Sequence, residues 1–334
     1  MTFLIQQTLM FAVPLMLVAL AGIFAERSGI INLALEGIMI IGAFVGAFTV
    51  RLVQQGGATA ESAQLVALLA MLMAAIIGAV FSLLLSFASI NLKADQTIGG
   101  TALNLLAPAL VMFLTLRVAS SGTLDMYRGD SPEWFMIHKE DLGIASESGG
   151  FFVDTFLDGF YLSTYICILL FVVLSVLLYR TRFGLRLRAC GENPQAADSL
   201  GINVKKMRYA GTTISGALAG IGGFLYALTV ANCSSTGGVA GYGFLALAVM
   251  IFGNWNPLTT AGAAFIFGLF KCIAASYHSL DINGDGVAWL ATIGLNSNFY
   301  RILPYLITLL VLAFTSKKSR APKAEGVPYD KGMR

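Results

Sequence analysis

One carboxylate, Glu36, lies in an otherwise uncharged run that reaches from Ser28 to Val50. On insertion scales, a carboxylate that faces lipid near the centre of a bilayer costs at least about 2.5 kcal/mol. Glu36 must therefore face the protein interior or a water-filled path. Two roles are open there: a hydrogen bond between helices, or a polar contact with a transported solute. The side chains that we predict to line such a path are Asn32, Glu36, Thr101 and Asn104. The asparagines have the alternative of hydrogen bonds between helices.

Patterns typical of catalysis or of metal binding do not occur in the sequence. It contains no GxxxxGK[ST] loop, no HExxH and no GxSxG, and its four cysteines are scattered without metal-site spacing. The segment from Asp281 to Gly286 matches the first half of a calcium loop, but Thr292 stands where the bidentate Glu is needed. We therefore expect no metal, no cofactor bound by this chain, no enzymatic activity and no nucleic-acid partner.

The elements that must position these side chains are membrane-spanning helices. Hydrophobic residues make up 57% of the 334-residue chain and charged residues 12%, whereas soluble domains carry about 25% charged residues. One crossing needs about 20 apolar residues. We expect an all-α, polytopic transmembrane bundle of nine to ten spans, with the first hydrophobic run retained as a span. The predicted spans are 4–24, 29–50, 64–90, 98–118, 160–180, 208–231, 241–253, 257–276 and 301–316.

Two apolar stretches are ambiguous, and a weak repeat is present. The span 241–253 is too short to cross untilted and is predicted to be a broken helix, while 286–296 is predicted to be re-entrant. The segments LALEGIMIIG (33–42) and LALAVMIFG (245–253) are similar, which suggests two pseudo-repeat halves. Glycine pairs at four-residue spacing predict close helix packing, although glycine is common in membrane helices anyway. The pairs are Gly42/Gly46, Gly216/Gly220 and Gly237/Gly241.

The distribution of Lys and Arg predicts the orientation. The loop 180–208 and the tail 317–334 are basic, whereas the segment 119–159 is rich in acids and poor in Lys and Arg. The positive-inside rule places the basic loop and tail in the cytoplasm. Residues 1–316 then form the transmembrane domain, with 119–159 outside, the N-terminus outside and the C-terminus cytoplasmic.

The basic loop contains a short helical signal. Asn193 is a suitable N-cap, Pro194 fits the first helical position and Gly201 fits a C-terminal stop. The alternative is an ordinary connecting loop that carries positive-inside charges.

The residues of this loop resemble a known family. The pattern T-x-F-G-x-x-L-R-A-x-G-E-N-P-x-A-A-x-x-x-G-I, from Thr181 to Ile202, resembles the cytoplasmic loop of ABC-transporter permeases of the ribose and branched-chain amino acid class. The segment ERSGIINLALEGIMIIGAF (26–44) resembles the second span of that class. The branched-chain amino acid branch typically has N-x-A-H-G where this chain reads Ala34-Leu35-Glu36-Gly37. This segment and TIGGTALNLLAPALVMFL (97–114) are closest to the nucleoside and simple-sugar branch.

The resemblance implies a permease subunit of an ABC importer for a nucleoside or a simple sugar, in a prokaryotic cytoplasmic (inner) membrane. The implied partners are a separate ATPase subunit that binds the ATP, a second permease of a different sequence, and an extracytoplasmic substrate-binding protein or lipoprotein. The segment 119–159 could meet that binding protein or be a solvated insertion. The residues implied to couple to the ATPase are Gly191, Glu192, Asn193, Pro194, Ala196, Ala197, Leu200 and Gly201.

Other functions stay open at this point. They are an ion-coupled secondary transporter, a permease for branched-chain amino acids, and a membrane-embedded enzyme or scaffold. The loop 179–209 favours the ABC permease, because an ion-coupled carrier has no need of a helix that docks on an ATPase.

Overall fold

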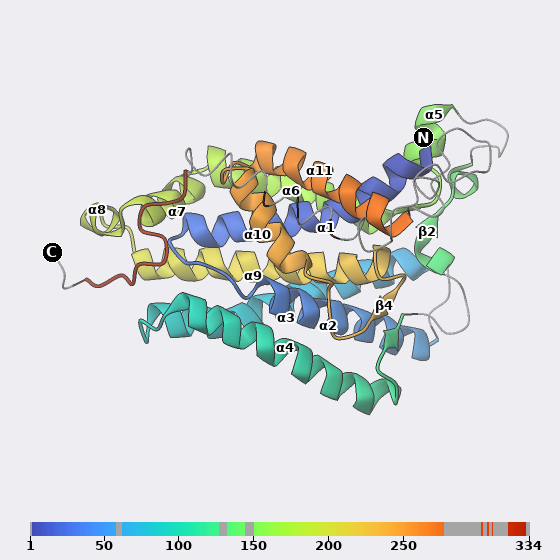
Figure 1. Ribbon diagram of the computed structural model, residues 1–334, viewed down its shortest axis with the longest axis horizontal. Helices are drawn as coiled ribbons and strands as arrows, with labels where there is room; N and C mark the ends of the chain where they lie inside the picture. Colours follow the sequence, from blue (N-terminus) through green and yellow to red (C-terminus); the bar gives the residue numbers. More distant parts are fainter. Residues whose placement is uncertain are drawn as a thin grey trace.

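The computed structural model describes residues 2–57, 62–126, 132–143, 150–276 and 320–331, together with the single positions 302, 306 and 309. Seven described helices are long and apolar enough to cross a membrane, which confirms the polytopic helical bundle (Figure 1). They are α1 (Thr2–Arg27), α2 (Leu35–Gln55), α3 (Ala63–Ile90), α4 (Gln96–Ala119), α6 (Leu162–Arg180), α9 (Val204–Thr229) and α11 (Pro257–Ser276). The predicted stretch 286–296 lies outside the described residues, as does 301–316 apart from the three single positions.

Helix α9 forms the centre of the bundle and packs against α1, α2 and α3. Two of the predicted glycine pairs allow this packing. A methyl group on Gly42 would collide with the backbone of Gly220, and one on Gly216 would collide with α3 at Ser82. Helix backbones therefore approach closely at these positions, as small residues permit between membrane helices. Helix α4, by contrast, buries a single stripe of residues and lies at the edge of the bundle (Figure 1).

Two elements begin inside the bundle rather than at its ends. The predicted span 29–50 is wrong at its start: residues 28–34 are not helical, and α2 begins only at Leu35. The predicted short span at 241–253 is the 11-residue helix α10 (Tyr242–Phe252), which follows a non-helical segment after α9. The third glycine pair lies in that segment, where Gly237 and Gly241 adopt positive φ angles of 77° and 74°. This pair therefore shapes a turn and does not pack two helices.

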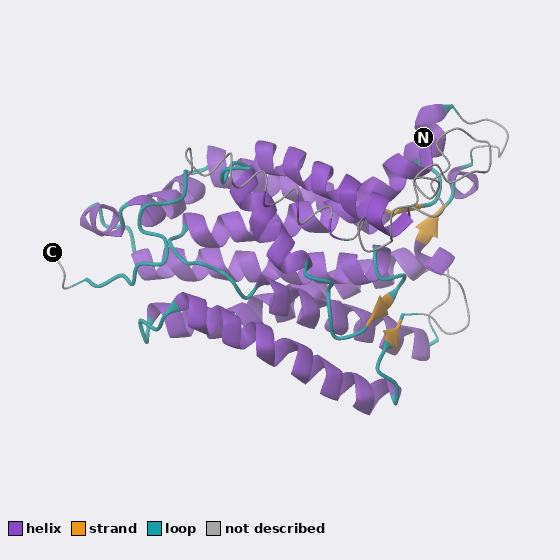
Figure 2. Cartoon of the chain, in the orientation of Figure 1, coloured by secondary structure: helices purple, strands orange, loops and turns teal. Residues whose placement is uncertain are grey.

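The two ends of the bundle differ. The end that holds the N-terminus carries short elements: β1 (Leu124–Asp125), η2 (Pro132–Phe135), β2 (Met136–Ile137), η3 (Lys139–Leu142), α5 (Phe151–Phe156), β3 (Phe160–Tyr161) and β4 (Ser234–Ser235). Two antiparallel pairs, β1 with β4 and β2 with β3, fasten the segment 119–159 to the bundle (Figure 2). The opposite end carries α7 (Arg182–Glu192), α8 (Pro194–Ser199) and the C-terminal segment 320–331.

The predicted loop 180–208 is more ordered than the sequence suggested. Its basic first part forms α7, whose N-cap Thr181 accepts a hydrogen bond from Gly184 N at 3.2 Å. The short helix α8 was predicted but α7 was not, although the buried residues of α7, Gly184, Leu187, Cys190 and Gly191, recur at helical spacing. We refer to this end of the molecule as the basic end.

Candidate functional site

Two polar side chains of α4 stabilise the non-helical segment 28–34 and the start of α2 that follows it. Asn104 of α4 accepts from Gly37 N at 2.8 Å and donates to Leu33 O at 2.7 Å. Gln96, at the start of α4, accepts from Ile31 N at 2.7 Å. Irregular backbone at membrane depth is tolerated only where the protein buries it or where it lines a water-filled cavity. These side chains supply hydrogen-bond partners for backbone groups, which lipid tails cannot do.

Asn32 lies inside the same segment and is fully buried. Its Nδ2 donates to Ser215 Oγ of α9 at 2.9 Å, and its Oδ1 accepts from Ala34 N at 3.2 Å. The side chain thus joins the turn before α2 to the central helix.

Glu36, in the first turn of α2, binds the start of α10. Its carboxylate accepts from Gly241 N at 3.0 Å and from Gly243 N at 2.6 Å. The first N–H groups of a helix have no partner within the helix, so Glu36 acts as an N-cap supplied by another element. The backbones also meet here, because a methyl group on Gly243 would collide with Glu36 N.

Lys271 of α11 lies near this junction. Its Nζ is 5.1 Å from the centre of the Tyr242 ring, and Tyr242 itself packs on Tyr226 of α9 with ring centres 4.7 Å apart. A cation near an aromatic face is attracted by the ring quadrupole. The starts of α2 and α10 therefore form one buried junction of polar and aromatic side chains.

The predicted path residues separate into two groups. The structure brings Asn32, Glu36 and Asn104 together around the junction, where Glu36 is 9% exposed. Thr101, one turn before Asn104, is exposed on the outer face of α4, and its hydroxyl donates to Thr97 O of its own helix. Ser215 and the backbone donors Gly241 and Gly243 were not predicted as partners of these side chains. The glycine-rich turn 237–243 was the only local signal for the last two.

At the basic end, α8 has the cap chemistry that its sequence predicts. Asn193 Oδ1 accepts from Ala196 N at 3.0 Å, Pro194 occupies the first turn, and Gly201 follows the helix with φ +81°. Leu200 is 82% exposed, and Ala196 is exposed beside it. The outer face of α8 therefore consists of Gln195, Ala196 and Ser199, and the exposed apolar side chain of Leu200 follows at the C-cap.

The inner face of α8 is packed. Ala197 is 2% exposed and contacts a small cluster with Cys190 of α7 and Val204 of α9, against which Tyr329 also packs. Burial raises the pKa of the Cys190 thiol to about 11. The cluster holds α8 on its neighbours, so a displacement of α8 would also move α7 and α9.

The end of α7 is joined to α1. Gly191 is buried, and a methyl group there would collide with Arg27 O. The carboxylate of Glu192 lies 3.3 Å from Arg27 Nη1, and Arg27 Nη2 donates to Trp255 O in the turn between α10 and α11. The short helix at the basic end is thus linked through α7 to the ends of α1 and α10.

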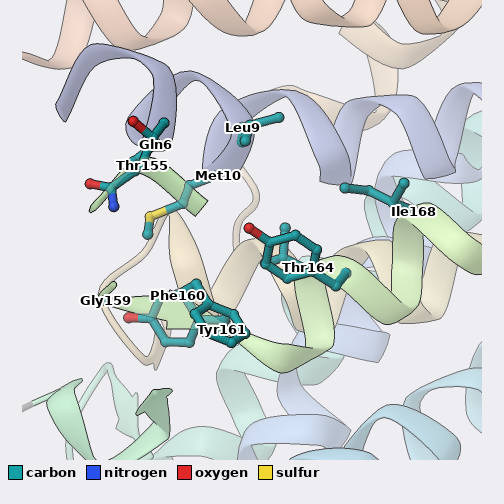
Figure 3. Close-up of a pocket in the computed structure, with 10 residues that line it drawn as sticks. Gln6, Leu9, Met10, Thr155, Gly159, Phe160, Tyr161, Thr164 and Ile168 are labelled. Atoms are coloured by element: carbon teal, nitrogen blue, oxygen red, sulfur yellow. The ribbon is translucent and has the colours of Figure 1, made fainter. Parts of the chain in front are cut away.

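A small cavity lies at the end of the bundle opposite the basic end. It measures about 30 Å³ and lies between α1 and α6, with Gln6, Met10, Tyr161 and Thr164 among its lining residues (Figure 3). Gln6 Nε2 donates to Asp154 O and Asp158 O at 3.0 and 2.7 Å, which joins α1 to the segment 119–159. The volume suits an ordered water and is far too small for a nucleoside or a sugar.

Comparison with known proteins gives consistent matches. The family described as branched-chain amino acid transport system / permease component matches residues 4–312. A guanosine ABC transporter permease protein of Bacillus subtilis is 40% identical over 337 residues, covering 100% of this chain and 98% of that protein. A nucleoside ABC transporter permease protein of Lactococcus lactis is 39% identical over 328 residues, covering 98% and 96%. A second nucleoside ABC transporter permease protein of that organism matches over only 107 residues, covering 32% of this chain and 29% of that protein, at 30% identity.

A putative glucose ABC transporter permease protein of Haloferax volcanii is less similar, at 29% identity over 93% of this chain and 91% of that protein. None of the solved structures matches. The family match covers more than nine-tenths of the chain, including every membrane-spanning helix described above and the helices of the basic end. This multi-pass membrane protein therefore belongs to the permease family of the branched-chain amino acid transport system.

Proposed function

We propose that this chain is a permease subunit of an ABC importer, that it forms part of the path for a nucleoside, and that a separate ATPase subunit drives it. The observation that carries the proposal is α8, a capped helix at the basic end whose inner face is packed and whose C-cap, Leu200, is 82% exposed. An exposed leucine at a helix end rich in Lys and Arg is suited to a protein partner. The chain itself is a transport subunit, and ATP binds to the ATPase.

A nucleoside is favoured over a sugar or an amino acid by the relatives. The two relatives near 40% identity over the whole chain carry the words guanosine and nucleoside, whereas the glucose relative is at 29% identity. A simple sugar is the second candidate. The unequal similarity to the two lactococcal permeases supports a second permease of different sequence as the partner in the membrane.

The orientation follows from charge. The basic end is cytoplasmic by the positive-inside rule, which places the N-terminus and the segment 119–159 outside. That segment then faces a substrate-binding protein or lipoprotein. The membrane is the prokaryotic cytoplasmic membrane, since every named relative is bacterial or archaeal.

We place the path along the exposed face of α4. Helix α4 is the least buried of the seven described spans, and Thr101 is exposed on it, one turn before Asn104, which bonds to the start of α2. A path at the edge of one subunit is closed by the second permease. Glu36 and Asn32 lie behind this face. Their hydrogen bonds to α10 and α9 stabilise the helices that border the path.

The experiment is reconstitution of this chain with its ATPase, second permease and binding protein in liposomes. Uptake of guanosine is compared with uptake of glucose and leucine, with ATP inside the liposomes. We expect ATP-dependent uptake of guanosine that exceeds uptake of the other two. Uptake without ATP, driven by a proton or sodium gradient, would instead identify a secondary transporter.

The role of α8 is tested with Leu200→Glu, because this side chain is exposed and its replacement leaves the core intact. We expect loss of ATPase binding and of uptake with normal insertion in the membrane. The matched control is Leu157→Glu at the opposite end, where the leucine is 37% exposed. Normal ATPase binding by Leu200→Glu would remove α8 from the interface.

A further inference from the structure

The C-terminal segment 320–331, here called the strap, is bound along the basic end by backbone hydrogen bonds. Arg320 N donates to Asn254 Oδ1 at 2.7 Å, Ala324 N donates to Gly191 O at 2.9 Å, and Gly326 N donates to Gly29 O at 3.3 Å. The strap therefore contacts the α10–α11 turn, the end of α7 and the turn after α1 in succession. A charged tail free in solution would not make this series of contacts.

The last part of the strap runs beside α8. Val327 O accepts from Arg208 Nη1 of α9 at 3.0 Å, and Arg208 is only 1% exposed. Tyr329 packs on the cluster that holds the inner face of α8, and Asp330 pairs with Lys93 Nζ at 2.5 Å. The strap and α8 lie at the same end of the molecule (Figure 1).

A hollow of about 480 Å³ lies between the end of α8, the start of α9 and the strap. Its lining includes Lys205, Lys331, Tyr329, Gly201 and one acid, Asp198. Both lysines are exposed, and neither forms an ion pair with an acid in the described part of the chain. Leu200, which directly precedes Gly201, provides an apolar contact beside this cationic hollow.

We propose that α8 and the strap form one docking surface for the ATPase subunit, in which an acidic side chain of the ATPase enters the hollow between Lys205 and Lys331. This inference rests on the proposed function. Exposed Leu200 lies beside Lys205 and Lys331, which form no ion pair in the described part of the chain. This arrangement is complementary to a partner surface with an apolar groove and acidic residues at its edge. The strap thus supplies part of the docking surface. Its hydrogen bonds also connect that surface to α1, α7, α9 and the α10–α11 turn.

The test uses single cysteines introduced at the strap. The four native cysteines are buried, so thiol labelling reports the introduced one. Lys331→Cys and Lys323→Cys are labelled with a maleimide in nanodiscs, with and without the ATPase. Both lysines are exposed, but only Lys331 lines the hollow. We expect the ATPase to slow labelling at residue 331 severalfold and to leave labelling at residue 323 nearly unchanged.

Charge-reversal variants test the affinity of the permease for the ATPase. Lys331→Glu removes an attraction and adds a repulsion, so we expect ATPase binding to weaken by at least about fivefold, with the loss reduced at high salt. Lys323→Glu is the matched control. Equal weakening by both variants, or by neither, would overturn the proposal.

Two further outcomes separate this proposal from its alternatives. If Leu200→Glu abolishes ATPase binding while residue 331 is neither protected nor sensitive to charge reversal, the proposed function stands and the strap is outside the interface. If anionic lipid without ATPase protects residue 331 as strongly as the ATPase does, the lysines face headgroups and the docking proposal is wrong.

Discussion

The junction between α2 and α10 gives the most direct prediction, through Glu36→Leu and Glu36→Gln. The carboxylate accepts two backbone N–H groups at the start of α10, where no preceding turn offers a carbonyl. Interactions between polar groups of membrane helices average about 0.6 kcal/mol and reach about 1.7 kcal/mol, and a buried donor left unpaired costs about 1–3 kcal/mol. We therefore expect Glu36→Leu to lower the free energy of unfolding by about 2–4 kcal/mol.

The glutamine variant should lose about half as much. Its carbonyl oxygen still accepts one hydrogen bond, while its amide nitrogen faces the second donor and cannot accept from it. The assay is thermal unfolding of the purified protein in detergent, with uptake measured in parallel. Thr101→Val is the control, because the Thr101 hydroxyl bonds only to its own helix in the described structure and its loss should leave stability unchanged.

Two results would refute this reasoning. Equal unfolding temperatures for Glu36→Leu and wild type would mean that the carboxylate does not stabilise the start of α10. Wild-type stability together with lost uptake in both Glu36 variants would assign the carboxylate to contact with the solute. The expected result is the stability order wild type, then Gln, then Leu, with uptake following the same order.

Three other substitutions test separate parts of the structure. Asn104→Leu removes both hydrogen bonds to the start of α2 and should destabilise the protein by about 2–4 kcal/mol in the same unfolding assay. Gly220→Leu should prevent assembly of the bundle, because even a methyl group there collides with Ala74 O, whereas Gly262→Ala, with open space around it, should be silent in size-exclusion chromatography. Burial raises the pKa of Glu325, although a hydrogen bond with Glu26 and the charge of Arg27 lower it, so the folded state disfavours the ionised carboxylate and the stability of the bound strap falls as pH rises through the raised pKa. Glu325→Gln, which cannot ionise, should reduce that pH dependence in the mobility of a spin label on residue 323; an unchanged pH profile would contradict it.

Local signals explain what could be predicted. The length of an apolar run decides whether a helix can cross the membrane, and the cap residues Asn193 and Gly201 act within one turn of α8. Both features are therefore readable from neighbouring residues. The helix α7 was missed although its buried residues recur at helical spacing, because its arginines were interpreted only as positive-inside charges of a loop. The start of α2 was placed six residues too early because segment 29–34 is as apolar as a helix.

The sequence by itself determined the membrane class, most of the spans, the basic end and the helix α8, since each depends on composition or on contacts within a few residues. Only the tertiary structure decided what Glu36 binds, because its partner Gly241 is 205 positions away in the chain. The same holds for the two breaks in the bundle and for the strap, whose hydrogen-bond partners lie on other elements. Backbone N–H and C=O groups outside a helix at membrane depth need hydrogen-bond partners from elsewhere in the protein, and these come together only in the folded chain.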